Sequence, residues 1–470
     1  MTGVLTGVLL SVQDVILGVP AMVLILGVGL YLTVRLGFPQ IVLLPRALKL
    51  FFRRLFSSET PREETSPFQA LCTALAATVG TGNLVGVAGA ICLGGPGAIV
   101  WLWVCGIVGM ATKFSEAALA VRYRVRKEVG WAGGPMYVMT RGLGEKFRPL
   151  AKAYCAFGIL AAFGVGNAAQ INAVITGITG AAQQLGGEVS PKWNLLLGLL
   201  LAVLVGILLF GGAKRIGAAA EMLVPVAAGA YIFLCIGVLL VFRGRIPEAL
   251  RQILTGAFCP RAVTGGMLGS AFRALRVGCS RGVFTNEAGM GTASIAHAGA
   301  CGVHPAEQGL MGIVEVFLDT IVICTLTALS ILVSGVPIPY GEDVGAALTV
   351  QAFSTVYGRF SGILLSAALT LFAVATILGW GLYGARCAEF LLGSRGWRIF
   401  AAAQTAMVIL GAVLDTNLVW QLSELANGLM AVPNLICLAA LAPELCRITK
   451  EYRNPASLAA AGGGKYADFH

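Results

Sequence analysis

Charged side chains are scarce in this sequence: Asp, Glu, Lys and Arg make up 12% of its 470 residues, against roughly a quarter in soluble domains. Hydrophobic residues make up 57%, and the mean hydropathy is +0.84. So few charges exclude a soluble globular protein, and a disordered chain would show the opposite bias. Long apolar runs also exclude a transmembrane β-barrel, whose strands alternate apolar and polar residues. The composition predicts an all-α polytopic membrane protein.

Histidine is almost absent, with 3 residues in the chain, which excludes a histidine-rich metal centre. The 12 cysteines include no CxxC pair and lie mostly singly in apolar runs, so they read as packing residues. No HExxH motif occurs, so we expect no enzyme and no cofactor. The net charge of +11 does not indicate a nucleic-acid partner, because the Lys and Arg residues lie mostly in short loops between apolar runs.

Apolar runs long enough to cross a bilayer, about 20 residues each, predict eleven spans. The first covers about 6–34, and a basic amphipathic stretch with Arg46, Lys49, Arg53 and Arg54 follows at the membrane surface. The other ten spans are expected at 67–93, 96–121, 153–182, 193–211, 217–242, 263–300, 307–334, 357–391, 398–414 and 417–445.

These spans divide the chain into an N-terminal helix with its linker, two blocks of five helices, an external linker and a cytoplasmic tail. The expected boundaries are 1–66, 67–242, 243–262, 263–445 and 446–470. With the N-terminus outside, the loops on the inner side hold 23 Lys and Arg residues and those on the outer side hold 6. The excess of positive charge predicts an external N-terminus and a cytoplasmic C-terminus in a multi-pass protein of the cell membrane.

Two of the predicted spans are abnormal. Segment 67–93 contains TVGTGNLVGVAG, and segment 263–300 is too long for one straight span and contains VGCSRGVFTNEAGMGTAS. They are the first and sixth of the ten core spans, so they hold the same place in two blocks of five. Because five is odd, the second block is inserted upside down. Interrupted spans in matching positions of inverted halves are typical of secondary transporters.

A helix broken at membrane depth exposes backbone groups that lipid cannot satisfy. Freed amides attract a carboxylate and freed carbonyls attract a cation. Gly80 and Gly82 allow close approach of a ligand to the backbone, and Thr78, Thr81 and Asn83 add oxygen atoms suited to a substrate or a hard cation. The alternative is that the glycines of this segment only permit close packing of helices.

Several motifs carry a resemblance to a known family. TVGTGNLVGVAGAICLGGPGAIVWLWVCGIVGMATKFSEAALAVRYR at 78–124, RGVFTNEAGMGTASIAHA at 281–298, ILGWGLYGARC at 377–387 and GGPMYVM at 133–139 occur in order along the chain. Together they resemble the alanine/glycine:cation symporter family. The resemblance implies a leucine-transporter-like 5+5 inverted repeat with one extra N-terminal helix. It also implies sodium-coupled, or less often proton-coupled, uptake of alanine and glycine.

The resemblance also implies the site. The residues that match the family's substrate site are Thr78, Gly80, Gly82, Gln170, Thr376 and Trp380. An amide such as that of Gln170 is costly in an apolar run unless it is paired, and it can donate to or accept from a zwitterion. Trp380 offers a large face that limits side-chain size or meets an ammonium group. The alternatives are an interhelical hydrogen bond for Gln170 and ordinary packing for Trp380.

Asn83 resembles the asparagine that helps to bind sodium in the wider fold, and Thr81 and Asp319 complete the candidate sodium ligands. The resemblance implies that one archaeal-type pattern of the family carries an acidic residue about four positions before the threonine, where this sequence has Ala74. The substrate ammonium group therefore has no carboxylate partner on the first core helix, and Gln170, backbone carbonyls or a third group must bind it.

Charged residues inside spans are candidates for function. Lys113 and Glu116, three residues apart, are expected to pair on one helix. Glu315 and Asp319 share a helical face and repel each other, so a cation must lie nearby. Arg276, Arg281 or a bound ion can supply it, and the cluster is either a structural ion pair or part of a transport site. The candidates are Glu116, Glu221, Arg273, Arg276, Arg281, Glu287, Glu315, Asp319 and Glu424.

The sequence therefore predicts a sodium-coupled symporter of alanine and glycine that works by alternating access. The alternatives within the same fold are proton coupling or a changed amino-acid or nucleobase specificity. A channel would need a continuous ring of pore groups, which inverted halves do not favour. An intramembrane enzyme is not favoured, because no HExxH motif occurs in this chain. The expected partners are alanine or glycine, the sodium ion and the lipid bilayer.

Overall fold

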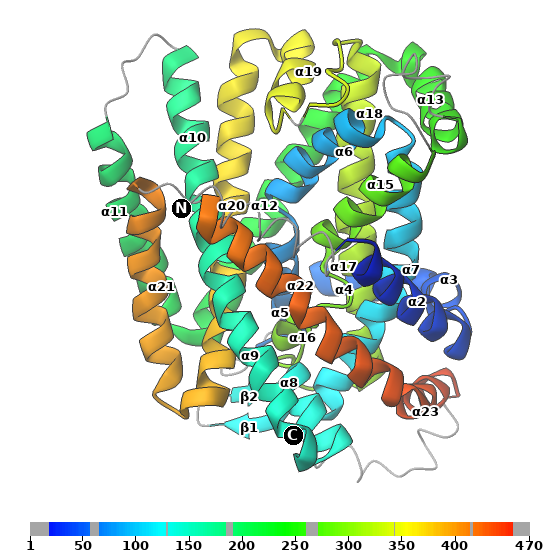
Figure 1. The fold of residues 1–470 in the computed structure, drawn as a ribbon, viewed down its shortest axis with the longest axis vertical. Coiled ribbons are helices and arrows are strands. Elements are labelled where there is room, and N and C mark those ends of the chain that lie inside the picture. Colours follow the sequence, from blue (N-terminus) through cyan, green and yellow to red (C-terminus); the bar gives the residue numbers. More distant parts are fainter. Residues whose placement is uncertain are drawn as a thin grey trace.

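The computed structural model consists of helices and one short hairpin within the residues that it describes (Figure 1). These residues are 18–56, 65–127, 130–184, 191–259, 271–342, 344–413 and 417–454. The hairpin joins β1 (Val125–Lys127) and β2 (Gly130–Ala132), which pair antiparallel. Helices dominate because a backbone in lipid must satisfy its polar groups internally.

The N-terminal region lies against the outside of the helical core. It consists of α2 (Val19–Arg35), α3 (Pro39–Val42) and α4 (Leu44–Leu55). Helix α2 packs on α7 and α22, and α4 packs on α17. The predicted first span, 6–34, corresponds to α2 as far as residues 19–34, and its residues 6–17 lie outside the described residues. The predicted basic amphipathic stretch corresponds to α4, which buries Ala47 and Leu50 on its apolar face.

The first block of five begins with a broken helix. Its elements are α5 (Pro67–Thr78), the π-helical turn η1 (Gly82–Gly86), α6 (Val87–Gly94), α7 (Ala98–Arg122), α9 (Arg148–Phe163), the π-helical turn η4 (Gly164–Ala168), α10 (Ala169–Gln184), α11 (Pro191–Leu209) and α12 (Gly212–Val241). Between α7 and α9 lie α8 (Pro135–Tyr137), η2 (Val138–Leu143) and η3 (Glu145–Phe147). After α12 come η5 (Arg243–Arg245) and α13 (Ile246–Phe258), a helix in the predicted external linker.

The second block also begins with a broken helix. Its elements are α15 (Ala271–Asn286), α16 (Thr292–His297), α17 (Pro305–Val316), the π-helical turn η6 (Phe317–Ile323), α18 (Cys324–Ser334), α20 (Ser361–Leu392), α21 (Gly396–Val413) and α22 (Asn417–Ala440). Before α20 lie α19 (Ala347–Tyr357) and η7 (Gly358–Phe360). After α22 comes α23 (Ala442–Arg453), which packs on α7 and α17 and reaches into the predicted tail.

Among the described residues, 8 helices are long and apolar enough to cross a membrane, and the bent pair α5 and η1–α6 makes a ninth span. The two other predicted spans correspond to α2 and to the interrupted pair α15 and α16. Each of these falls short of an uninterrupted span within the described residues. The sequence placed the interruptions correctly, in the first and sixth core spans.

The two blocks pack against each other through matching members. Helix α7 contacts α17, α10 contacts α20, and α11 contacts α21, which pairs the second, third and fourth spans with the seventh, eighth and ninth. The broken spans pair crosswise, because α5 contacts α16 and α6 contacts α15. In Figure 1, α7, α15 and α17 form one side of the molecule, while α10, α11, α20 and α21 form the other. Helices α5 and α16, one from each broken span, lie between these sides.

Glycines set the close approach of α7 to α17. A Cβ atom added at Gly312 would lie 2.7 Å from the Lys113 carbonyl oxygen, and one at Gly309 would lie 2.8 Å from the Phe114 ring. Helices pack in membranes through small residues that let backbones approach. This contact brings Lys113 of α7 next to the polar residues of α17 and η6.

Candidate functional site

The break in the first core span lies between Thr78 and Gly82. Helix α5 ends at Thr78, Val79 is extended (φ −78°, ψ 105°), and the two helical parts meet at an angle of 50°. The Gly80 amide donates a hydrogen bond to Asn83 Oδ1 at 2.8 Å instead of to a helical carbonyl. That carbonyl, on Ala76, is 3.0 Å from Thr376 Oγ1. The eighth span thus satisfies a group that the break leaves free.

Asn83 and Asp319 are in direct contact. Asn83 Nδ2 donates to Asp319 Oδ1 at 2.7 Å and to the Asp319 carbonyl at 3.2 Å. The Thr320 hydroxyl donates to Asp319 Oδ2 at 2.8 Å, and Asn286 Nδ2 donates to Thr320 Oγ1 at 3.3 Å. All four side chains are buried. Among the described residues no basic side chain forms an ion pair with Asp319, so its only partners are neutral donors.

The third predicted sodium ligand, Thr81, lies elsewhere. It makes no hydrogen bond with Asn83 or Asp319 and lines a cavity of about 800 Å³ between η1, α10, α19 and α20. Ala169, which precedes Gln170, lines the same cavity. We call this space the α10–α20 cavity; it connects the surface with the first-span break.

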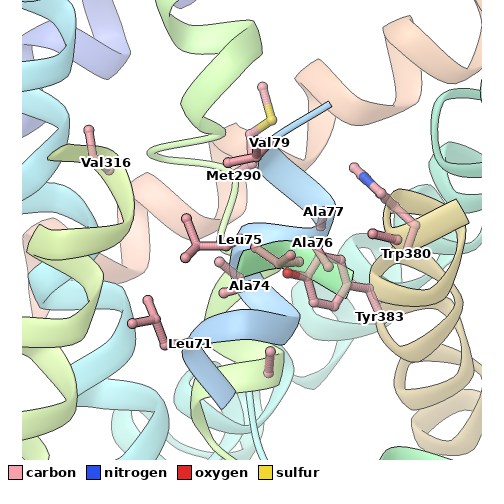
Figure 2. Packing of buried hydrophobic residues seen from close by; sticks show 14 of the residues in the cluster. Leu71, Ala74, Leu75, Ala76, Ala77, Val79, Met290, Val316, Trp380 and Tyr383 are labelled. Carbon is pink, nitrogen blue, oxygen red and sulfur yellow. The ribbon is translucent and has the colours of Figure 1, made fainter. Parts of the chain in front are cut away.

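The remaining predicted substrate residues lie around the end of α5. Figure 2 shows Trp380 and Tyr383 of α20 facing the last turn of α5, at Ala76 and Ala77. Trp380 is 1% exposed, and its Nε1 has no hydrogen-bond partner. Its side chain packs on Gly166, where an added Cβ would lie 2.4 Å from the Trp380 Cβ.

The side-chain amide of Gln170 has one hydrogen-bonded atom and one atom without a partner. Its Nε2 donates to the Val165 carbonyl at 3.1 Å, and its Oε1 is buried without a partner. Thr78 Oγ1 lies 3.3 Å from the Ala74 carbonyl, a weak bond within α5. Gly82 faces Thr285, whose Oγ1 would lie 3.5 Å from an added Cβ atom. The structure thus brings the first, third and eighth spans together around several unpartnered polar atoms.

Three π-helical turns coincide with these residues. Asn83 lies in η1, Asp319 lies in η6, and Gln170 is the second residue after η4. A π-helical turn displaces side chains from regular helical positions and frees backbone groups, and such turns are frequent at functional sites. These residues are among the predicted site residues, but no pattern in the sequence indicates the π-helical turns.

The break in the sixth core span is bound by a carboxylate. Helix α15 ends at Asn286 and α16 begins at Thr292. Glu116 Oε1 on α7 accepts hydrogen bonds from the amides of Gly289 at 2.9 Å and Gly291 at 3.0 Å, and from Asn434 Nδ2 at 2.7 Å. The predicted Lys113–Glu116 pair is therefore wrong: Glu116 stabilises freed amides of the break instead.

Lys113 pairs with the seventh span. Its Nζ lies 2.9 Å from Glu315 Oε1, and His297 Nε2 lies 3.0 Å from Glu315 Oε2. Gln308 Nε2 lies 2.7 Å from His297 Nδ1. The cation beside Glu315 is therefore Lys113 and not Arg276 or Arg281. His297, Gln308 and Asn434 were not predicted, because no local pattern in the sequence indicates hydrogen bonds between residues so far apart along the chain.

The three arginines of α15 lie in a different place. Arg273, Arg276 and Arg281 line a cavity of about 620 Å³ between α2, α15 and α22, together with Glu424. The Arg273 Nε donates to the Leu93 carbonyl at 2.8 Å. This cavity is separate from the Asn83–Asp319 pair.

Two broken helices in inverted blocks, with polar groups gathered where they meet, define a secondary membrane transporter rather than an enzyme. A family described as the sodium:alanine symporter family matches residues 2–461. The chain belongs to this family. It is 42% identical over 447 residues to the sodium/alanine symporter AgcS of Methanococcus maripaludis, covering 94% of this chain and 96% of that one.

Other similarities agree on the class of protein. The probable sodium/glutamine symporter GlnT of Bacillus subtilis is 38% identical over 432 residues, covering 92% of this chain and 87% of GlnT. The crystal structure of MhsT in complex with L-phenylalanine superposes with a TM-score of 0.56 at 13% identity, covering 83% of this chain and 99% of MhsT. The fold is that of the leucine-transporter type, as the sequence predicted.

Proposed function

We propose that this protein couples the entry of sodium to the uptake of alanine and glycine by alternating access. The observation that carries the proposal is the Asn83–Asp319 pair: a buried carboxylate at the break of a core helix, held at 2.7 Å by an amide and bonded to no basic side chain among the described residues. A charged residue at membrane depth requires a counter-charge, and the oxygens around it suit a hard cation.

The sodium ion in this proposal binds the Asp319 carboxylate and the Thr320 hydroxyl. Its further ligand is either the Asn83 side-chain oxygen or nearby backbone carbonyls. Thr81, which lies on the wall of the α10–α20 cavity, acts along the path of entry rather than beside Asp319. Sodium in this place links η1 to η6, so its binding favours one arrangement of the broken helix. This is how ion binding couples to substrate binding in the proposal.

The substrate binds between the first, third and eighth spans, next to Thr78, Gly80 and Gly82. Two buried polar atoms without partners, Gln170 Oε1 and Trp380 Nε1, support this position. An unpaired buried polar group costs free energy that a ligand can recover.

Access from outside runs through the α10–α20 cavity, which ends at Thr81 and Ala169. The excess of basic residues on one side supports a multi-pass arrangement in the cell membrane with the N-terminus outside and the C-terminus in the cytoplasm.

Uptake of labelled alanine and glycine into proteoliposomes tests the proposal. We expect uptake with an inward sodium gradient, none when choline replaces sodium, and counterflow of labelled substrate, which a channel does not show. Asp319→Asn should raise the sodium concentration required for half-maximal uptake by about tenfold or more, while Glu424→Gln, at another carboxylate of a core helix, should not. Uptake that persists in choline and collapses with a protonophore would instead establish proton coupling. A preference for glutamine over alanine would establish the specificity that the name GlnT describes.

A further inference from the structure

Glu287 has an unusual backbone for its side chain. It follows directly after α15 and has φ +52°, in the left-handed region that non-glycine residues rarely adopt. The side chain is 4% exposed. Strained residues of this kind persist where the surrounding structure over-determines them, and they concentrate at functional sites.

The Glu287 carboxylate has fewer partners than the other acids buried in the core. Its Oε2 accepts a hydrogen bond from the Thr292 hydroxyl at 2.6 Å, and its Oε1 has no hydrogen-bond partner among the described residues. Glu315 has Lys113 and His297, and Glu116 accepts three hydrogen bonds. Glu287 therefore retains a free acceptor and no bonded cation.

The surroundings of Glu287 belong to the proposed substrate site. The indole nitrogen of Trp380 interacts with the Glu287 carboxylate, but the pair does not reach the geometry of a regular hydrogen bond. The Tyr383 hydroxyl, on the next turn of α20, is also buried without a partner, and the two rings are 5.7 Å apart. An aromatic face, a carboxylate oxygen and free acceptors suit an organic ammonium group.

The balance of charge in this part of the core also favours a cation here. Its buried acids include Glu116, Glu287, Glu315 and Asp319, and its buried lysine is Lys113. Gln308 Nε2 lies 2.7 Å from His297 Nδ1 and 3.4 Å from the Pro67 carbonyl, which orients the amide as a donor to the ring. His297 Nε2 lies 3.0 Å from Glu315 Oε2. Lys113 is bonded to Glu315, and no basic side chain forms an ion pair with Glu287 among the described residues.

We propose that Glu287 binds the ammonium group of the transported amino acid. It supplies a carboxylate, which the first core span (67–93) lacks. The Gln170 Oε1 and the Tyr383 hydroxyl are further acceptors, and the substrate carboxylate points to the break at Gly80. The inference rests on the proposed function, because it names a residue for that same site. It requires a primary or secondary ammonium group, so lactate and propionate are poor substrates.

Glu287→Gln tests the inference, with Glu424→Gln as the matched control. Full-length protein in proteoliposomes is assayed for labelled alanine uptake at saturating sodium, with alanine, lactate and propionate as competitors. Loss of a charge-assisted contact should weaken alanine competition by about 10- to 100-fold and leave lactate nearly unchanged, while Glu424→Gln keeps the wild-type order. Purified Glu287→Gln should retain its sodium-dependent rise in melting temperature and lose the alanine-dependent rise.

Two results would overturn the inference. One is an alanine affinity in Glu287→Gln within about twofold of wild type. The other is a change confined to the sodium concentration for half-maximal uptake, which would make Glu287 a sodium ligand. If Glu287→Gln does not fold, Glu287→Asp, which keeps the charge on a shorter side chain, must weaken alanine more than sodium. The wild-type protein alone tests the proposed function. If it does not take up alanine with sodium, the proposed function itself is contradicted.

Discussion

The two broken helices solve the same backbone problem with different chemistry. At the first break, neutral groups satisfy the freed atoms: Asn83 accepts from the Gly80 amide, and the Thr376 hydroxyl bonds to the Ala76 carbonyl. At the sixth break, the buried carboxylate Glu116 holds two amides, and the Tyr154 hydroxyl donates to the Met290 carbonyl at 3.0 Å. The first break is therefore held weakly, and the sixth is fixed firmly to α7 and α9.

This difference indicates which of the two breaks can change conformation more easily. Weak neutral bonds exchange readily for ligand contacts, so we expect the first break to be the part that sodium and substrate reorganise in the proposed mechanism. A carboxylate that binds two amides and an asparagine in a medium of low dielectric is costly to displace. In the same proposal the sixth break is a fixed support that orients Glu287 toward the substrate.

Removing the anchor of the sixth break should have the largest effect. Glu116→Ala leaves the Gly289 and Gly291 amides without their acceptor, and leaves Asn434 Nδ2 with the Gly289 carbonyl alone. At about 1–3 kcal/mol for each unpaired buried donor, the loss of stability is on the order of 5 kcal/mol. Thermal unfolding of purified protein in detergent measures it. Glu116→Gln retains an acceptor oxygen and should lose much less, and equal losses in both variants would show that the anchor is not its acceptor oxygen.

The ion pair between α7 and α17 comes next. Lys113→Met leaves Glu315 buried with His297 as its remaining partner and should cost about 3–5 kcal/mol. The double variant Lys113→Met with Glu315→Met removes both charges and should recover most of that stability. The same unfolding assay compares the two, and a double variant no more stable than the single one would contradict a structural role for this pair.

The third effect concerns how Trp380 selects substrates by the size of their side chains. Trp380→Ala opens space beside the end of α5, so alanine affinity should fall while valine and leucine improve relative to alanine. A few methylenes in a tight pocket correspond to about 1–3 kcal/mol, or roughly 10- to 200-fold in selectivity. Competition of labelled alanine uptake by glycine, alanine, valine and leucine measures the order. An unchanged order would place the indole outside the pocket and make it a packing residue of α20.

Thr376→Val should have a smaller effect on stability. The valine keeps the volume but leaves the Ala76 carbonyl at the first break without its hydroxyl partner, at a cost of about 1–2 kcal/mol. Thr376→Ser retains the hydroxyl and should stay close to wild type. Unfolding in detergent measures both, and a valine variant as stable as the serine variant would show that Ala76 has another partner.

The sequence predicted the helical class, the place of both breaks and most residues around them. It succeeded because Gly80 and Gly82 in an apolar run are a local signal, and because intramembrane acids such as Asp319 are rare. It could not predict the partners. Lys113 and Glu116 are adjacent on a helical face, yet the packing of α17 on α7 brings Lys113 to Glu315. Such pairings depend on tertiary packing, which no short window contains.

The smallest loss of stability is expected for Gly80→Ala, and its comparison with Gly291→Ala distinguishes the two breaks. At Gly80, an added Cβ meets only the Thr376 Oγ1, at 3.0 Å, and the side-chain hydroxyl can shift by a few tenths of an ångström. Gly80→Ala should therefore cost less than about 1 kcal/mol in stability, in line with a small overpacking.

At Gly291, by contrast, φ is +77° and an added Cβ would lie 2.4 Å from Pro135 Cγ. Gly291→Ala should then cost at least about 1–2 kcal/mol from the left-handed backbone alone, before any clash. Unfolding of both variants in detergent checks the order. In the proposed mechanism the first break adapts to a ligand, so Gly80→Ala should alter alanine and sodium affinity while it leaves stability nearly unchanged. If instead Gly80→Ala destabilises the protein as much as Gly291→Ala, the first break is as rigid as the sixth, and ion-driven reorganisation must occur elsewhere in the core.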